Sequence, residues 1–210
     1  MRITVFGATG RTGKQLVEQA LEAGNDVVAY VRSPSKLDMN HKHLTIVQGK
    51  LTDQALIERA VRGANAVISV LGPRGGSKSK PLTEGMQNII AAMKKQGVRR
   101  LIISSTLSAK DPNDLPEFRA RALVNLVKLT MHATYEEIIS VAETVRASDL
   151  DWTIVRLTML NDKPKSGKVR VGYLGKGEVR TWISRADVAD FMLKQVEDTK
   201  YLRQAPAISN

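Results

Sequence analysis

Short apolar runs alternate with amphipathic segments along most of the chain. The apolar runs are rich in Val, Ile and Leu and are bounded by polar or glycine residues, which is typical of buried strands. Between them, apolar residues recur three or four positions apart, which predicts helices. The predicted strands are 2–6, 26–31, 44–48, 66–71, 100–104 and 152–156. Strands that alternate with helices predict an α/β fold, a Rossmann-type doubly wound parallel sheet in a single domain over residues 1–210.

Cap and turn residues indicate where the helices begin and end. Asp53 is a candidate N-cap, and Gly97 is a typical C′ residue for the helix that precedes it. An irregular stretch, 106–116, follows the fifth strand and leads into one long helical region that reaches about residue 148. After the sixth strand the chain is rich in turns until a helix near 186–196. We therefore expect the substrate-side elements at about 106–122 and 157–182.

A glycine-rich turn lies between the first predicted strand and the first helix. It reads Gly7-Ala8-Thr9-Gly10-Arg11-Thr12-Gly13. Gly7 permits a tight turn, Gly10 lets the backbone approach a pyrophosphate, and Gly13 lets the helix pack close to the strand. The N–H groups of the helix N-terminus would face the anion. The alternative is a tight turn with incidental glycines, but the strand on one side and the helix on the other favour dinucleotide binding.

The end of the second strand indicates which dinucleotide is bound. NAD-binding chains of this fold carry an acidic residue there, whereas residues 30–36 contain none, and Asp26 comes too early in the strand. Arg32 and Lys36 would instead meet a 2′-phosphate, and Arg11 could add to the same positive pocket. Unless these three are ordinary surface cations, the sequence favours NADP(H) over NAD(H).

Composition narrows the function classes. The net charge is +11, which is consistent either with a nucleic-acid surface or with attraction of anionic cofactors and substrates. The cations are dispersed and only 4% of residues are aromatic, so the second interpretation is favoured. A loose C-terminal group of cations consists of Lys163, Lys165, Lys168, Arg170 and Lys176.

The chain has no cysteine and only three histidines, so no metal site is expected. No apolar run approaches membrane-spanning length, and the first residues form a predicted strand rather than a signal sequence. We expect a cytoplasmic protein without a membrane partner.

Several of these segments together resemble the atypical short-chain dehydrogenase/reductase superfamily. More narrowly, the chain is similar to the biliverdin-IXβ reductase/flavin reductase branch and its NmrA-like relatives. The resemblance covers nearly the whole chain. The matching segments are 7–13, 31–37, Leu71-Gly72-Pro73-Arg74, 83–93 and 183–189.

The resemblance implies roles for residues along a bound cofactor. Residues 7–13, with Thr9 and Thr12 among them, would hold the pyrophosphate, and Arg32 with Lys36 the 2′-phosphate. Leu71, Gly72 and Arg74 would flank the ribose-phosphate path. Lys50 and Leu51 would lie beside the adenine, although many relatives carry an acid where Lys50 stands. The backbone of residues 157–160, including Thr158 and Met159, would lie along the nicotinamide carboxamide.

The catalytic residues of ordinary short-chain dehydrogenases are absent. Their Tyr-x-x-x-Lys pair is missing, because Tyr135 is followed four residues later by Ile139, so Tyr135 is interpreted as a helix packing residue rather than a proton donor. Met159 stands where this branch has a histidine near the substrate, and His132 is the histidine nearest the pocket region in sequence. Ser105 and Thr106, at the end of the fifth strand, are the candidate catalytic residues, because they would orient the substrate and the nicotinamide.

The missing acid favours one class of reaction. A conjugated, electron-poor ring accepts a hydride with little proton help from the protein, whereas a simple ketone needs a positioned acid. We therefore expect an NADPH-dependent reductase of a flavin, a quinone or a biliverdin-like tetrapyrrole, with an anionic or aromatic small molecule as acceptor. The alternative is a non-catalytic NmrA-like NADP(H) sensor that acts on a protein partner, since the same cofactor motif serves both.

Overall fold

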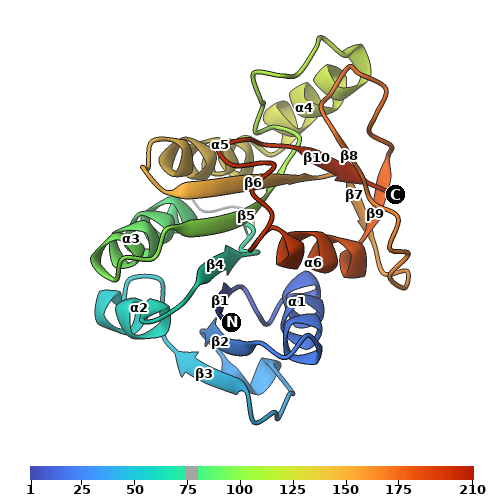
Figure 1. Cartoon of the computed structure of the whole chain (residues 1–210). Coiled ribbons are helices and arrows are strands. Elements are labelled where there is room, and N and C mark those ends of the chain that lie inside the picture. Colours follow the sequence, from blue (N-terminus) through green and yellow to red (C-terminus); the bar gives the residue numbers. More distant parts are fainter. Residues whose placement is uncertain (74–79) are drawn as a thin grey trace.

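The protein is built on one eight-stranded sheet. The computed structural model describes residues 1–73 and 80–210, with the side chains of residues 119–121 and 123 left aside. The strand order is β3-β2-β1-β4-β5-β6-β10-β8, in which only β8 runs antiparallel to its neighbour (Figure 1). The strands are β1 (Arg2–Phe6), β2 (Asp26–Val31), β3 (Leu44–Gln48), β4 (Ala66–Ser69), β5 (Arg100–Thr106), β6 (Asp151–Leu157), β8 (Arg170–Gly172) and β10 (Ala207–Ser209). The order 3-2-1-4-5-6 is that of the doubly wound dinucleotide-binding fold, so the predicted fold class is confirmed.

Helices cover both faces of this sheet. On one face lie α1 (Arg11–Glu22) and α6 (Arg185–Lys194), and on the other lie α2 (Gln54–Val61), α3 (Pro81–Lys95) and α5 (His132–Arg146) (Figure 1). A short 3₁₀ turn, η1 (Pro34–Lys36), follows β2. Gly97 has a φ of +70° and Val98 N–H donates to the Met93 carbonyl, so α3 ends at the predicted C′ glycine.

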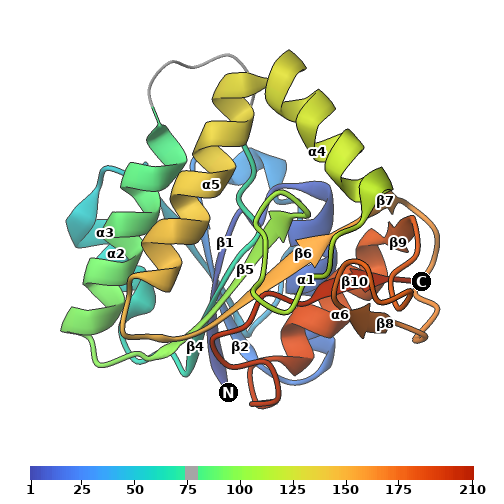
Figure 2. The ribbon, with the colours of Figure 1, turned by 90° about the horizontal axis from the view of Figure 1, so that it is seen from above.

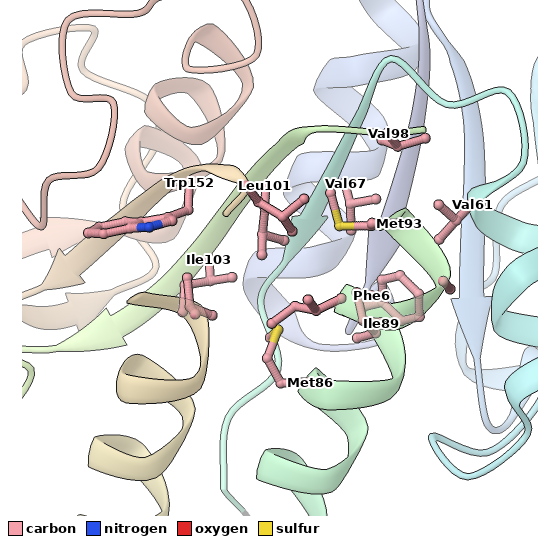
Figure 3. Packing of buried hydrophobic residues seen from close by; sticks show 14 of the residues in the cluster. Phe6, Val61, Val67, Met86, Ile89, Met93, Val98, Leu101, Ile103 and Trp152 are labelled. Carbon is pink, nitrogen blue, oxygen red and sulfur yellow. The ribbon is translucent and has the colours of Figure 1, made fainter. Parts of the chain in front are cut away.

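The apolar residues of the two layers form two buried clusters, one on each side of the sheet. On the α3 side, Figure 3 shows Met86, Ile89 and Met93 of the helix beside Phe6 and Leu101 of the sheet. The helix residues are spaced three and four apart, and each buried side chain of this size contributes about 1.5–3 kcal/mol. This burial holds the strands, and with them the loops at their carboxyl ends, in fixed positions.

The prediction of one long helical region after residue 116 is wrong in one respect, because the structure has two helices there. α4 (Phe118–Thr130) ends at Met131, and α5 begins at His132 at an angle to it (Figure 2). At the break, the Thr130 hydroxyl donates to the Leu126 carbonyl, 2.8 Å away. Met131 has a φ of -132° and a ψ of 47°, which are not helical values, so the first helix ends there without proline or glycine.

The turn-rich tail contains four short strands that the sequence does not predict. β7 (Met159–Asn161) pairs with β9 (Trp182–Ser184) in a separate two-stranded sheet, while β8 and β10 extend the main sheet beyond β6. Each is three residues long, which is too short for an alternating pattern to show. The tail therefore builds the side of the molecule next to the ends of β5 and β6.

Candidate functional site

A cavity of about 640 Å³ opens at the carboxyl ends of β1, β2 and β4. In doubly wound sheets this edge binds ligands where the strand order reverses, which here is between β1 and β4. Eight residues predicted to bind the cofactor line the cavity: Gly7, Thr9, Gly10, Arg32, Lys50, Leu51, Leu71 and Gly72.

The glycine turn after β1 is constrained at both ends. Gly7 has a φ of +86°, and a Cβ there would lie 2.9 Å from the Val70 carbonyl carbon of the neighbouring strand end. A Cβ on Gly13 would lie 2.1 Å from the Gly7 carbonyl oxygen. Gly7 adopts a backbone conformation that favours glycine, and Gly13 leaves no room for a Cβ. The turn therefore brings α1 close against β1.

Gly10 is different, because the space beside it is open. A Cβ there would meet only the Gly7 carbonyl oxygen, at 3.4 Å, and the residue is exposed at the cavity. The first N–H groups of a helix have no intrahelical acceptor, and Gly10, the N-cap of α1, has no side chain that could accept from them. An open surface beside unpaired N–H groups fits a pyrophosphate.

Tyr30 forms the inner wall of the cavity, a role that the sequence did not reveal. Its ring is buried against Phe6, and its hydroxyl donates to the Lys50 carbonyl, 2.7 Å away. Burial, with the nearby Asp53 carboxylate, raises the pKa of Tyr30 to about 12, so it remains a neutral donor. A Cβ on Gly49 would lie 2.2 Å from the Tyr30 oxygen, which explains the glycine before Lys50. The strand pattern predicts that Tyr30 is buried but not that its hydroxyl shapes the site.

The predicted 2′-phosphate cations are separated in the structure. Arg32 is exposed and lines the cavity directly after β2, whereas Lys36, in η1, is exposed but is not part of the lining. Arg11 does not line the cavity and pairs with Asp162, at 2.9 Å. Arg74 lies outside the described residues. Arg32 is therefore the cation best placed for a phosphate beside the end of β2, and the roles of Lys36 and Arg11 stay predictions.

The proposed hydride side lies along the ends of β5 and β6, beyond the cavity lining. Ser105 and Thr106 end β5, and the Thr106 hydroxyl accepts from the Ser108 N–H, 3.3 Å away. The Thr158 hydroxyl donates to the Ile208 carbonyl, 3.0 Å away, so this side chain is held by the sheet. The Met159 N–H donates to the Thr181 carbonyl, while its side chain is half exposed.

A buried ion pair fixes the loop that follows β5. Arg156, in β6 and fully buried, donates to both carboxylate oxygens of Asp114, at 2.6 and 2.7 Å. Burial alone would raise the pKa of Asp114, but hydrogen bonds from the Arg156 guanidinium and from the backbone N–H groups of Asp111 and Leu174 lower it below the ordinary value. The loop from Thr106 to Asp114 is thereby held to β6 and to the tail. A strand pattern contains no signal for such a pair.

Tyr135, Glu137 and His132 of α5 lie near the site. Tyr135 is in α5, where the Lys128 ammonium lies 5.7 Å from its ring centre, and it is not part of the cavity lining. The buried Glu137 carboxylate, which is part of the lining, accepts from the Leu82 N–H at the start of α3, 2.7 Å away. His132 is exposed, next to the lining residue Ala133.

Residues 1–73 and 80–210 contain no group of three or more His, Cys, Asp or Glu residues that could hold a metal ion. Within the same residues, no helix is long and apolar enough to cross a membrane.

Residues 7–199 match a protein-family model described as NAD(P)H-binding. The chain belongs to this NAD(P)H-binding family. The match begins at the first glycine of the turn and continues through α6, so the family covers both the cavity and the elements beyond β6.

Curated relatives of the chain differ in their described roles. The chain is 27% identical to the photosystem II assembly factor Ycf39 of Synechocystis, over 94% of this chain and 59% of Ycf39. It is 26% identical to the oxidoreductase aflX of Aspergillus parasiticus, over 95% of this chain and 80% of aflX. The chain thus spans only about three fifths of the length of Ycf39.

Solved structures share the fold over the whole chain. A short-chain dehydrogenase/reductase from Veillonella parvula in complex with NADP has a TM-score of 0.78 at 22% identity, covering 100% of this chain and 94% of that one. ChuY, an anaerobillin reductase from Escherichia coli O157:H7, has a TM-score of 0.74 at 21% identity, covering 100% and 97%. These neighbours share the Rossmann-type fold of this chain, so the predicted fold is confirmed.

Proposed function

We propose that the protein is an NADPH-dependent reductase that transfers hydride to a conjugated small-molecule acceptor, such as a flavin, a quinone or a biliverdin-like tetrapyrrole. The observation that carries the proposal is the cavity at the β1–β4 switch point, with open space at Gly10 and the cation Arg32 at the end of β2. A cytoplasmic location belongs to the same proposal, since a chain without cysteine is compatible with a reducing compartment.

The lining supports NADPH rather than NADH. A 2′-hydroxyl would be held by a carboxylate at the end of β2, but residues 30–36 offer none, while Arg32 offers a forked guanidinium to a phosphate. Gly10 and the first turn of α1 would hold the pyrophosphate, and the apolar side chain of Leu51 would contact the adenine.

On the acceptor side, the residues orient groups rather than supply a proton. NADPH, when bound, would supply a hydride, and a conjugated acceptor could take its proton from solvent, so no positioned acid would be needed. Ser105 and Thr106, at the carboxyl end of β5, would orient the reacting rings. Tyr135 has no lysine one turn later, and it packs on Lys128 instead.

The test is NADPH oxidation measured against flavins, quinones and biliverdin, with NADPH and NADH binding measured by titration in parallel. Turnover with a conjugated acceptor and tighter NADPH binding are expected. Tight NADPH binding without turnover on any acceptor would overturn the reductase assignment and favour an NADP(H) sensor with a protein partner. Equal binding of NADPH and NADH would overturn the cofactor preference.

A further inference from the structure

A second cavity, of about 890 Å³, lies beside the two-stranded sheet of β7 and β9. Its walls come from the loop 161–170, from the segment 180–182 and from Asn210. None of these residues lines the cofactor cavity. The second cavity is therefore a separate hollow on the tail side of the molecule.

The cavity gathers cations that have no acidic partner among the described residues. Its lining includes Lys163, Lys168, Arg170 and Arg180, and none of the four lies within 4.0 Å of a carboxylate oxygen in the described chain. Neighbouring cations behave differently. Lys165 pairs with Asp190 at 3.4 Å, and Arg185 pairs with Asp162 at 2.7 Å. Of the loose basic group seen in the sequence, Lys163, Lys168 and Arg170 line the cavity without an acidic partner, whereas Lys165 is paired and Lys176 lies over the Tyr173 ring outside the lining.

The loop 161–170, which carries three of these cations, is held in place by a buried carboxylate of α6. Asp187, fully buried in α6, accepts from the backbone N–H groups of Ser166 and Gly167, at 3.0 and 2.9 Å, and from the Ser184 hydroxyl. Burial would raise the pKa of Asp187, but the hydrogen bonds from Ser184, Ser166 and Gly167 lower it below the ordinary value. Asn210 also donates to this carboxylate. The cavity walls are therefore preorganised, which reduces the entropy lost when a ligand binds.

An aromatic surface borders the cations. Trp182, 47% exposed, lines the cavity, and it is the register partner of Met159, which is 50% exposed. Partners in adjacent strands point to the same face, while Leu160 and Ile183, one residue further on, pack into the core. Trp182 and Met159 therefore share the outer face of the β7–β9 sheet.

This face is connected to the cofactor side through the segment that follows β6. Met159 is predicted to lie beside the nicotinamide, and Asn161 and Lys163, a few residues later, line the second cavity. Between them, Asp162 pairs with Arg11 of the glycine turn at 2.9 Å. One short segment thus runs from the predicted nicotinamide position, past the glycine turn, to the cations.

From this arrangement we infer that the second cavity binds the anionic part of the acceptor, a planar conjugated molecule with at least one phosphate or carboxylate group. The ring system lies against Trp182 and Met159, and the anionic groups contact Arg170, Arg180 and the lysines of the loop. Guanidinium groups bind both anions with paired hydrogen bonds. The acceptor role rests on the proposed reductase function, whereas the binding of an anionic aromatic ligand does not.

The test compares two flavins that share one ring system. Flavin mononucleotide carries a phosphate and riboflavin does not, so the difference in their dissociation constants isolates the anion. We expect flavin mononucleotide to bind about tenfold more tightly or better, since one charge-assisted contact is worth about a factor of ten. This preference should weaken as the salt concentration rises.

Two double variants test whether the second cavity causes the tighter binding of flavin mononucleotide. Arg170→Gln with Arg180→Gln should bring flavin mononucleotide to the affinity of riboflavin. The matched control, Arg59→Gln with Arg62→Gln, removes the same charge from exposed positions on and just after α2, on the opposite face of the sheet. This control should keep the preference. If both doubles lose it equally, or if the wild type binds the two flavins equally, the inference is wrong.

Fluorescence provides a readout that does not depend on turnover. The chain has two tryptophans, of which Trp152 is buried in the cluster on the α3 side and Trp182 borders the cavity. Flavin mononucleotide should quench the emission of Trp182, and Trp182→Phe should abolish most of the quenching. Quenching that persists in this variant would place the flavin elsewhere.

The two proposals fail separately. Phosphate-dependent binding and Trp182 quenching without NADPH oxidation on any acceptor would leave the anion cavity standing and overturn the reductase function. NADPH oxidation with equal affinity for both flavins in every variant would keep the reductase and overturn the cavity assignment.

Discussion

The glycine turn makes opposite predictions for two of its glycines. A methyl group at Gly13 would lie 2.1 Å from the Gly7 carbonyl oxygen and 2.8 Å from the Ala8 Cα, both of which are backbone atoms. To reach an ordinary contact of about 3.5 Å, α1 must move away from β1 by more than about 1 Å. Because α1 buries Leu16, Val17 and Ala20 against the sheet, this movement disturbs packed core.

Overpacking of this kind costs about 1–3 kcal/mol, and a clash with backbone belongs at the upper end. For a chain of this size, each 1 kcal/mol lowers the melting temperature by about 2–4 °C, so Gly13→Ala should melt about 6–12 °C lower. Gly10→Val faces open space and loses at most about 1 kcal/mol as a helix N-cap, so it should melt within about 4 °C of the wild type. It should nevertheless lose binding of NADPH and NADH, because its methyl groups occupy the space for the pyrophosphate.

The assay is thermal unfolding by circular dichroism, followed by cofactor titration of each folded variant. The reasoning about packing is refuted if Gly13→Ala melts with the wild type. The reasoning about binding is refuted if folded Gly10→Val keeps the wild-type affinity for NADPH.

Three further predictions concern charge and the acceptor side. Arg32→Asp should weaken NADPH binding at least tenfold more than NADH binding in titrations, because it replaces a phosphate contact with repulsion; equal weakening would show that Arg32 is not at the 2′-phosphate. Asp114→Asn should lower the free energy of unfolding by about 3 kcal/mol or more, because it leaves Arg156 buried without its partner. The lowered pKa of Asp114 means that the wild type holds this stability above about pH 4 and loses it as the pH falls further, so urea titrations should converge for the two proteins at low pH, and a constant gap would contradict the assignment. Steady-state rates at saturating NADPH should stay within a few-fold for Tyr135→Phe and fall roughly tenfold for Thr106→Val, since only the second removes an orienting hydroxyl; the reverse result would overturn the site assignment.

Periodicity was sufficient to predict the parallel core of the sheet, and the predicted glycine turn lines a cavity in the structure. Buried parallel strands are continuous apolar runs, and the glycines of the turn have local, steric reasons to be glycine, so both leave a signal in neighbouring residues. The cavity lining after β4, with Leu71 and Gly72, followed from the resemblance rather than from the pattern.

Features made by distant residues could not be predicted in this way. Arg100 and Arg156 look like ordinary charged residues in or beside strands, yet both are buried, Arg100 on the Gln195 carbonyl and Arg156 on Asp114. Their partners are more than 40 positions away in the chain. The three-residue strands of the tail could not be predicted either, because they form by pairing with distant strands and have no alternating pattern of their own.

The position of β10 between β6 and β8 determines the order in which parts of the sheet can fold during synthesis. β8 contacts the main sheet only through β10, so residues 170–172 cannot join it until residues 207–209 have left the ribosome. The strands β1, β2 and β4, whose ends line the proposed cofactor cavity, are complete by residue 69, well before that point. During synthesis, the strands β1, β2 and β4 can therefore fold first, whereas the second cavity can form only after β10 has joined the sheet. The same division should be visible in hydrogen exchange, with β8 and β10 opening together while β1, β2 and β4 stay protected.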